Sequence, residues 1–491
     1  MVGSRFLVFV FVVVAFYSNS LIATDIDLNY FKEEDAIIDK FTGEGEFRSM
    51  EDMEKLVGSL PEIPNYKHYN YEEMVKNLQD MANAFPKLTH LYSIGRSVEG
   101  RELWVLAISR NPKVHTFGVP EVKYVANMHG DETTCLNLML WLAWTLLNEA
   151  ERNPWIGQML DRTRIHLMPS MNPDGWEQSL RKDPVRRGRT NAHDVDLNRN
   201  FPSRFPLKPR PAPEPETLAV MRWSQEIPFV LSANFHGGTA LVNYPWDDSD
   251  VIQSGSRYNP SPDNALFVRL SYTYARAHER MWKPGPRCVT EDQEHPADPK
   301  RGIINGAYWY IVSGGMQDWI YLHTNGFEVT VETNCVKDSP KSDLRRLWIE
   351  NRYALLHYIH AAQHAISGRV YDEETNEPLP GTLIRVDEQA KSVTSFEGGE
   401  YWRLLNIGEY EVLYTHPGYT PVVKKVKLTR DARSQRIDVA LRKLGDSTES
   451  SPNPSMDQWL LEVLPKKIAK AVKLVTNELG GAVSTLTSLF C

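Results

Sequence analysis

A histidine and a glutamate that could share a metal ion stand just after a short apolar run. His129 and Glu132 follow residues 122–126, a run typical of a buried strand. A pair three residues apart in a strand-to-helix turn can bind one ion. Catalytic zinc takes three His or carboxylate ligands and leaves a fourth position for water. The chain has 14 histidines, so roughly one such pair is expected by chance, and the pattern needs further ligands to carry weight.

Further polar motifs follow in order along the chain. The motifs are Asn172-Pro173-Asp174-Gly175, Gly188-Arg189, the run from Asp196 to Pro202, Asn234-Phe235-His236-Gly237-Gly238, Trp309-Tyr310, the run from Gly314 to Asp318, and the run from Glu328 to Glu332. Each falls at a predicted strand end or in a polar loop, where α/β sheets build their sites. The alternative is that these residues have no catalytic role. Arg189 and Arg199 would then be solvated surface residues, and Tyr310 would be a core aromatic residue.

These motifs together make the sequence similar to the M14 family of zinc carboxypeptidases, and specifically to the regulatory group that includes carboxypeptidases E, M, N and D. The resemblance runs from about residue 69 to residue 443. It implies one zinc ion per chain, bound by His129, Glu132 and His236. It also implies that Asp196 orients His129 from behind the metal.

The resemblance assigns the remaining roles. Glu332 would be the general base. Arg189 would stabilise the oxyanion that develops on the scissile carbonyl. Asn198 and Arg199 would hold the terminal carboxylate of the substrate, which would make the protein an exopeptidase. Tyr310 matches the mobile tyrosine that closes over the substrate in this family.

Specificity for Lys or Arg depends mainly on one carboxylate. Asp247 matches the floor of the pocket for the substrate's last side chain, and Gln317 matches a second residue of that pocket. A buried carboxylate favours a cationic side chain over an apolar one. The alternative is that Asp247 or its neighbour Asp248 caps a loop. The chain departs from the group at Cys135-Leu136-Asn137, where Gly-Arg-Glu is usual, so packing beside the metal site is expected to differ.

The chain has four cysteines. The resemblance pairs Cys288 with Cys335, in a loop that includes Tyr310 and Glu332. Cys135 and Cys491 would then be unpaired.

The elements that position these motifs lie within residues 66–365, where apolar strand-like runs alternate with amphipathic ones. Strands are expected at 103–108, 122–126, 164–168 and 229–234, and helices at 136–147 and 344–365. This alternation predicts an α/β domain with a mixed central sheet flanked by helices, the fold that the resemblance implies.

The character changes after Ser367. Short runs rich in β-branched and aromatic residues, at 383–386, 410–415, 422–428 and 437–441, are separated by Pro-Gly and Gly-Gly turns. They predict a small all-β sandwich over 366–443, which resembles the transthyretin-like domain of the group. A Ser/Pro-rich linker over 444–455 and an amphipathic basic tail over 456–491 follow. The tail could bind a membrane surface or pack on the protein.

Composition and the N-terminus bound the setting. The chain has 491 residues, 42% of them hydrophobic, which suggests two or three domains. A net charge of −8 gives no indication of a nucleic-acid partner. Residues 1–23 read as a secretory signal peptide, with an uncleaved anchor as the alternative. Residues 24–65 are acidic and irregular, which suggests a pro-segment or a poorly ordered arm.

The sequence therefore predicts a secreted, monomeric zinc carboxypeptidase that removes C-terminal Lys or Arg from peptides and proteins. A catalytically silent scaffold on the same fold is the alternative, and retention of Glu332 opposes it. A cytosolic enzyme that trims glutamates is a third reading, which Asp247 and the signal peptide oppose.

Overall fold

The computed structural model describes residues 30, 32–43, 45–181, 188–205, 211–250, 257–283, 288, 301–386 and 391–444. The chain divides into two compact units, Met1–Lys443 and Leu444–Cys491, and all but the last described residue belong to the first. The predicted signal peptide and basic tail lie outside the described residues. Among the described helices, none is long and apolar enough to cross a membrane.

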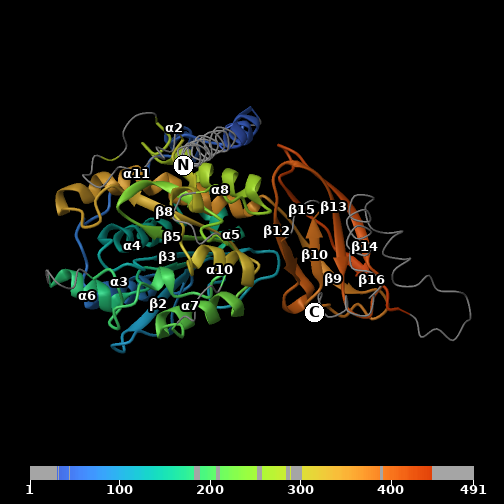
Figure 1. Cartoon of the computed structure of the whole chain (residues 1–491), viewed down its shortest axis with the longest axis horizontal. Helices are drawn as coiled ribbons and strands as arrows, with labels where there is room; N and C mark the ends of the chain where they lie inside the picture. Colours follow the sequence, from blue (N-terminus) through green and yellow to red (C-terminus); the bar gives the residue numbers. More distant parts are fainter. Residues whose placement is uncertain are drawn as a thin grey trace, which may run out of the picture. The chain divides into compact units, whose positions relative to one another are not determined.

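A mixed sheet of eight strands forms the centre of the first domain (Figure 1), in the order β1-β2-β4-β3-β5-β8-β6-β7. The strands are β1 (Thr89–Arg96), β2 (Glu102–Ile108), β3 (Glu121–Ala126), β4 (Arg164–Met168), β5 (Phe229–His236), β6 (Thr239–Tyr244), β7 (Ile303–Asn305) and β8 (Phe327–Asn334). The predicted strands at 103–108, 122–126, 164–168 and 229–234 all form, with bounds shifted by two residues at most.

The three strands that carry the site are neighbours at the middle of the sheet. β3, β5 and β8 are fully buried and run parallel to one another. Their carboxyl ends therefore meet at one edge, where α/β sheets place their ligands. The register sets Ala126 beside Phe235 and His236 beside Glu332, so the ends of all three strands lie level.

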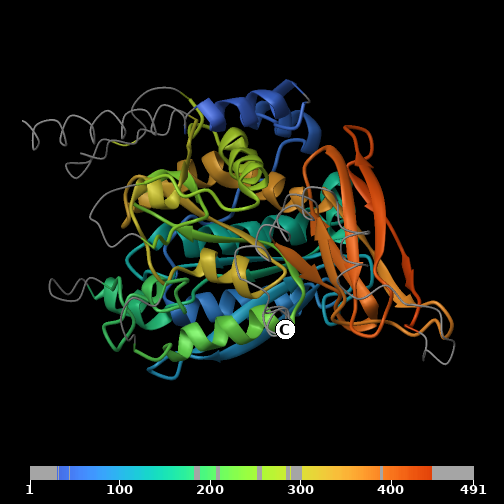
Figure 2. The same ribbon diagram turned by 45° about the vertical axis from the view of Figure 1, so that its right-hand side comes forward.

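Helices cover both faces of the sheet (Figure 2). They are α2 (Met50–Val57), α3 (Tyr71–Ala84), α4 (Thr133–Glu149), α5 (Pro154–Arg162), α6 (Pro173–Leu180), α7 (Pro215–Glu226), α8 (Asn264–Ala277), α9 (Gly306–Trp309), α10 (Met316–His323) and α11 (Leu344–His360). Alternate strand residues point to opposite faces: Tyr124 joins a core with α4, α8 and α11, and Val125 joins a separate core with α7 and α10. Helix α4 is buried nearly all round, as the apolar run at 136–147 predicts.

Two predictions about element bounds are wrong. The helix expected over 344–365 ends at His360, and a single 3-10 turn follows (Ala361–Gln363) before β9 begins at Ala365. Ala365 instead pairs with Leu404 and starts the second domain. The poorly ordered arm is also wrong for its described part. Residues 32–43 are helical, and α2 is N-capped by Ser49, whose side chain and that of Asp52 form a capping box.

The second domain is a sandwich of two sheets, ordered β11-β10-β13-β14 and β12-β9-β15, with β16 also pairing with β9. Its strands are β9 (Ala365–Asp372), β10 (Leu383–Val386), β11 (Ser392–Thr394), β12 (Glu400–Leu404), β13 (Gly408–Thr415), β14 (Val422–Leu428), β15 (Ser434–Arg436) and β16 (Val439–Leu441). The α/β-plus-sandwich prediction is thus confirmed.

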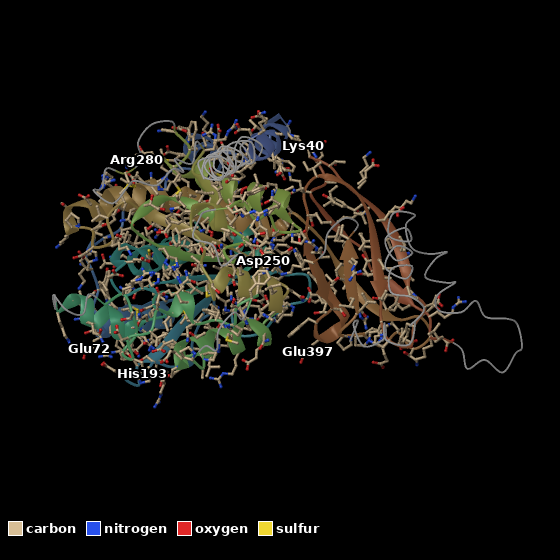
Figure 3. The ribbon with its side chains drawn as sticks, viewed as in Figure 1. Lys40, Glu72, His193, Asp250, Arg280 and Glu397 are labelled. Carbon is tan, nitrogen blue, oxygen red and sulfur yellow. A yellow bond between two sulfur atoms is a disulfide. The ribbon has the colours of Figure 1, made fainter. Side chains whose placement is uncertain are left out.

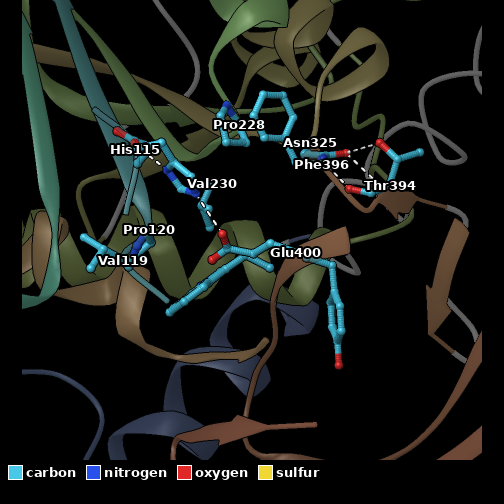
Figure 4. Close-up of a pocket in the computed structure, with 12 residues that line it drawn as sticks. His115, Val119, Pro120, Pro228, Val230, Asn325, Thr394, Phe396 and Glu400 are labelled. Atoms are coloured by element: carbon cyan, nitrogen blue, oxygen red, sulfur yellow. Dashed lines mark hydrogen bonds and ion pairs between the residues drawn. The ribbon is translucent and has the colours of Figure 1, made fainter. Parts of the chain in front are cut away.

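Charged side chains join the two domains. Arg403 of β12 is fully buried and pairs with Asp263 at 2.7 Å. His115 lies between Glu121 of the sheet and Glu400 of the sandwich, at 2.7 and 2.8 Å, and Figure 4 shows it at the edge of a small pocket. Burial opposes the charged form, but the two carboxylates outweigh it and raise the pKa of His115 to about 9. The imidazolium therefore links the domains at neutral pH.

Candidate active site

Three buried side chains converge at the carboxyl ends of β3 and β5. His236 is the last residue of β5, and His129 and Glu132 come from the turn that joins β3 to α4. His129 Nδ1 lies 3.0 Å from Glu132 Oε1, and His236 Nδ1 lies 2.8 Å from Glu132 Oε2. The two Nδ1 atoms are 3.1 Å apart. At these short distances, one carboxylate and two imidazole nitrogens form a set of ligands that could bind one metal ion.

The outer nitrogens of both histidines are held by acceptors. His129 Nε2 donates to Asp196 Oδ1 at 3.0 Å, and His236 Nε2 donates to Asn234 Oδ1 at 2.6 Å. A proton fixed on each Nε2 leaves the Nδ1 lone pair pointing inward, which is the tautomer a metal requires. The donor set therefore fits zinc, with three protein ligands of the type catalytic zinc sites use.

A carboxylate behind the site fixes the amide of Asn234. Glu328 is fully buried in β8, and its Oε1 accepts from Asn234 Nδ2 at 3.0 Å. A carboxylate only accepts, so it takes the NH₂ end of the amide and leaves the oxygen for His236. Asn234 and His236 share one strand face, two residues apart, and Glu328 lies beside Ser232 on the next strand. Both residues stand in motifs that the sequence singles out, but no role was predicted for either of them, although strand periodicity could have indicated one.

Close contact between glycines brings Arg189 to the metal site. A Cβ on Gly130 would lie 2.2 Å from the backbone of Gly175 and 2.5 Å from that of Gly188, so no larger residue fits. Arg189, next to Gly188, donates from Nη2 to Asp196 Oδ2 at 2.8 Å, and its Nη1 lies 3.7 Å from Glu132. Asp196 thus holds both His129 and Arg189. Burial raises the pKa of Asp196, but the hydrogen bond from His129 and the charge of Arg189 outweigh burial and keep this pKa far below its usual value.

Glu332 lies beside His236 in the sheet register and is buried. Its Oε2 has no hydrogen-bond partner among the described residues. Burial, and then the charge of Glu132, raise the pKa of Glu332 to about 8. A dication at the three ligands would favour the carboxylate and lower this value. The position suits a group that exchanges a proton with a water beside the metal.

Asn198 and Arg199 stand on a 3-10 turn (Leu197–Arg199), and the backbone nitrogen of Asn198 donates to Asp196 Oδ1 at 2.9 Å. Asn198 Oδ1 accepts from the backbone nitrogen of Met316 at 3.0 Å. The amide NH₂ of Asn198 is therefore the end that can donate to a ligand. The guanidinium of Arg199 lies near Asp247 and Tyr310, since its charge acts on the pKa of both groups. The structure thus brings the predicted clamp residues to the same place as the predicted pocket.

The predicted pocket residues also come together. Gln317 donates from Nε2 to Asn243 Oδ1 at 2.6 Å and accepts from Thr330 at 2.9 Å. Asp247 is 3% exposed, and its Oδ1 has no hydrogen-bond partner among the described residues. Burial, followed by the charge of Asp318, raises the pKa of Asp247 well above its usual value.

Two further residues, Asp318 and Gly306, contact the loop of Asp247. The sequence predicted no role for either of them. The carboxylate of Asp318 accepts from the backbone nitrogens of Asp247 and Asp248, at 2.9–3.1 Å. Gly306 approaches so closely that a Cβ there would lie 1.7 Å from Asp247 Oδ1. Asp248 accepts from the backbone nitrogen of Ser249 at 2.9 Å and from the hydroxyl of Ser313 at 3.1 Å. The loop-capping alternative is therefore confirmed for Asp248, and Asp318 has a similar role.

Tyr310 follows α9 and is 37% exposed, which excludes the core-aromatic reading. Partial burial, and then the charge of Glu332, raise the pKa of its phenol. Arg199, Asp247 and Arg189 also act on it, so Tyr310 stands among the candidate catalytic and clamp residues.

The cysteines behave as predicted where they are described. Cys288 and Cys335 form a disulfide, which closes a loop of 47 residues that contains Tyr310 and Glu332. Cys135 is buried and free, and Cys491 lies outside the described residues. In the divergent stretch, Cys135 lies 3.6 Å from Thr333, and Asn137 lies 3.0 Å from the ring of His68. The unusual residues therefore face the protein interior and the segment before α3.

An α/β sheet that presents a His–Glu–His cluster, an arginine clamp and an isolated glutamate at one edge has the arrangement of a metal-dependent exopeptidase. The zinc carboxypeptidase model matches residues 74–354, and the carboxypeptidase regulatory-like domain matches residues 365–442. The chain belongs to the zinc carboxypeptidase family, in its regulatory group. The resemblance stated from the motifs is thus confirmed.

Curated relatives agree with this assignment. The catalytic chain of carboxypeptidase N from Homo sapiens is 43% identical over 72% of this chain and 82% of its own length. Carboxypeptidase M from Mus musculus is 40% identical over 77% of this chain and 84% of its own. Carboxypeptidase D from Homo sapiens is 41% identical over 79% of this chain but only 28% of its own length. The chain thus spans about a quarter of that relative.

Proposed function

We propose that the protein is a secreted zinc carboxypeptidase that removes C-terminal Lys or Arg from peptides and proteins. The observation that carries the specificity is Asp247, a buried carboxylate near Arg199 whose Oδ1 has no hydrogen-bond partner in the part of the chain that the structure describes. Ionising a buried carboxyl costs free energy unless a cation lies beside it. The pocket therefore favours a basic side chain over an apolar or acidic one.

Substrate binding uses the two ends of the terminal residue. Arg199 and the NH₂ group of Asn198 hold the α-carboxylate, and Asp247 with Gln317 receives the basic side chain. Tyr310 closes over the bound residue from its exposed position. Holding both ends fixes the scissile bond beside the metal site, and this positioning contributes a large share of catalysis.

The chemistry at the scissile bond needs a Lewis acid and a base. A zinc ion held by His129, Glu132 and His236 would polarise the carbonyl and acidify a water. Glu332 takes the proton of the attacking water and returns it to the leaving amine. Arg189, held by Asp196, donates to the oxyanion as it forms.

The setting that we propose is the secretory pathway or the extracellular space, since residues 1–23 have the pattern of a signal peptide. The Cys288–Cys335 disulfide is typical of an oxidising compartment. The enzyme acts as a monomer on peptide substrates, without a nucleic-acid partner. Its basic tail, residues 456–491, provides peripheral contact with membranes.

A turnover assay on matched peptides ending in Lys, Arg, Leu or Glu tests this function, with and without a chelator, across pH 5 to 8. Cleavage of the Lys and Arg peptides that the chelator abolishes is expected. A preference for Leu would contradict the role of Asp247. Cleavage that survives the chelator would contradict the zinc mechanism.

A further inference from the structure

An N-terminal segment, here the residues Tyr30 and 32–43, reaches into the core of the catalytic domain. Tyr30 is 1% exposed and Glu34 is 4% exposed. The hydroxyls of Tyr30 and Tyr244 both donate to Glu34 Oε1, each at 2.9 Å. The backbone nitrogen of Asn305 donates to the hydroxyl of Tyr30 at 3.1 Å. This segment lies before residue 74, where the family model begins, so it is an addition to the part that the model matches.

The two anchor points belong to the two walls of the side-chain pocket. Tyr244 ends β6, three residues before Asp247. Asn305 caps α9, which leads through Gly306, the glycine in contact with Asp247, to Tyr310. The N-terminal segment therefore holds both the strand that presents the specificity carboxylate and the helix that presents the mobile tyrosine.

Hydrogen bonds already join these walls to each other. The backbone nitrogen of Ala307 donates to the carbonyl of Trp246 at 2.8 Å, and that of Val312 donates to the carbonyl of Asp247 at 2.9 Å. A shift of Tyr244 or Asn305 would thus be passed to the pocket floor. Tyr30 and Glu34 fix these two residues relative to each other from behind.

Packing and charge fix the segment in turn. The ring of Tyr30 lies 4.4 Å from that of Tyr258 and 4.6 Å from that of Tyr308, in a small apolar cluster with Leu241 and Ile304. Arg301, just before β7, bonds Asp35 at 2.9 Å and Asp39 at 3.1 Å. Aromatic contacts of this kind contribute beyond the area they bury.

We propose that this N-terminal segment is a working part of the enzyme rather than a removable pro-segment, and that Tyr30 and Glu34 are positioning residues of the pocket that selects the substrate's last side chain. The inference rests on the proposed function, because the pocket is the one assigned to Lys and Arg. Without the segment, Tyr244 and Asn305 would lose a buried hydrogen-bond partner each, and the loops of Asp247 and Tyr310 would lose their common support.

The charge state of Glu34 should make docking of the N-terminal segment depend on pH. Burial raises the pKa of Glu34 to about 7, although the tyrosine hydroxyls lower it. The groups that face this carboxyl are Tyr30 and Asp35 on its own segment, Tyr244 on β6, Tyr258, and Arg301 before β7. A carboxyl whose pKa is higher when docked than when free stabilises docking fully below its free pKa, and this contribution is lost as pH rises through about 7. Support from the segment is therefore greater at pH 5.5 than at pH 8.

The test compares full-length zinc-loaded enzyme with Tyr30→Phe, Glu34→Gln and Glu34→Ala. The control is Lys40→Ala, an exposed position on the same helical segment (Figure 3). kcat and KM are measured on peptides ending in Arg and in Leu at pH 5.5 and pH 8, with zinc content and melting temperature recorded for each variant. Glu34→Ala is expected to raise KM for the Arg peptide by roughly tenfold or more, because small displacements of binding groups are costly. Zinc content and the Lys40→Ala variant should match the wild type.

Conservative variants separate positioning from a general loss of folding. Glu34→Gln keeps an acceptor oxygen for the tyrosines and cannot ionise. The ratio of its KM to that of the wild type should therefore be close to one at pH 5.5 and below one at pH 8, which removes any pH dependence that both enzymes share. Tyr30→Phe removes one hydroxyl and should show an intermediate KM. If Tyr30→Phe and Glu34→Ala keep wild-type zinc and wild-type or improved KM, the inference is overturned. If wild type itself prefers Leu, the proposed specificity fails, and the effect of the same variants on the Leu peptide still decides the positioning role.

Discussion

The metal region and the side-chain pocket lie at the same edge of the sheet, yet their charges are arranged in opposite ways. Around His129, Glu132 and His236, each outer imidazole nitrogen has an acceptor, and Asp196 is matched by Arg189. In the pocket, burial and then the charge of the buried acid Asp318 raise the pKa of Asp247, and Asp247 Oδ1 has no hydrogen-bond partner within the described part of the chain. The first region has the donor set for a metal ion. Under the proposed function, a basic side chain of the substrate supplies the partner that the acids of the second region need.

This difference predicts which kinetic quantity each region controls. Changes in the metal region should lower turnover to the same extent for every substrate, because the metal and Glu332 act on the peptide bond. Changes in the pocket should alter the ratio between basic and apolar substrates, because Asp247 acts on the side chain. The following variants test that separation.

The largest effect is expected from Glu332→Gln. Removing the base should lower kcat by about 10³- to 10⁴-fold, within the range for a lost general acid–base group. The variant should bind zinc normally, since Glu332 is not one of the three ligands. Steady-state kinetics on Arg and Leu peptides should show equal losses for both. A change in the Arg-to-Leu ratio would break the separation.

Asp247→Asn should have the next largest effect, and on one substrate class alone. Loss of a buried charge partner typically costs about 2–4 kcal/mol, which is roughly 30- to 1,000-fold in kcat/KM for the Arg peptide. Cleavage of the Leu peptide should be unchanged or improved, because the buried charge is gone. Equal losses on both peptides would show that Asp247 supports the structure instead of selecting the substrate.

A third prediction concerns Glu328, behind the metal region. The double variant Lys123→Met/Glu328→Leu removes the acceptor of the Asn234 amide together with the buried lysine whose charge acts on it. Without that acceptor the amide can turn and present its NH₂ to His236, which disfavours the metal-binding tautomer. We expect zinc affinity to fall by about 10- to 100-fold, as for other groups that orient metal ligands.

The measurement is the zinc dissociation constant, by competition with a coloured chelator. Glu328→Gln is the matched control, because its amide oxygen can still accept from Asn234. It should bind zinc within a few-fold of the wild type. Wild-type affinity in the double variant would show that Asn234 keeps its orientation by other means.

The sequence predicted the metal region better than the pocket, for a physical reason. Each ligand is close in the sequence to a strand end and stands in a short motif of its own, and the resemblance to the family joined His129, Glu132 and His236 into one site. Asp318 supports the loop through the backbone amides of Asp247 and Asp248, which are 71 and 70 residues away, and Gly306 contributes only the absence of a side chain. Neither interaction has a local signal.

The structure of the N-terminal segment could not be predicted from its sequence either. Its acidic composition suggested an irregular arm, yet Tyr30 and Glu34 have partners more than 200 residues later in the chain. A buried carboxyl shared by two tyrosines follows from tertiary packing, which composition does not report. Local signals did predict four of the eight strands of the sheet and four of the eight in the sandwich, where β-branched alternation decides the structure.

The smallest expected effect is a pH dependence confined to the pocket. Because the pKa of Asp247 is raised in the free enzyme, a basic substrate must displace a proton to bind. Below that pKa, each unit of falling pH should weaken binding of the Arg peptide by at most about tenfold, and the neutral Leu peptide should be unaffected by this group. The ratio of kcat/KM for Arg to that for Leu should therefore rise with pH and then level off. In Asp247→Asn the ratio should be nearly independent of pH. A slope that persists in this variant would assign the titration to another group. Asp318 is the candidate, since burial raises the pKa of its carboxyl to about 7.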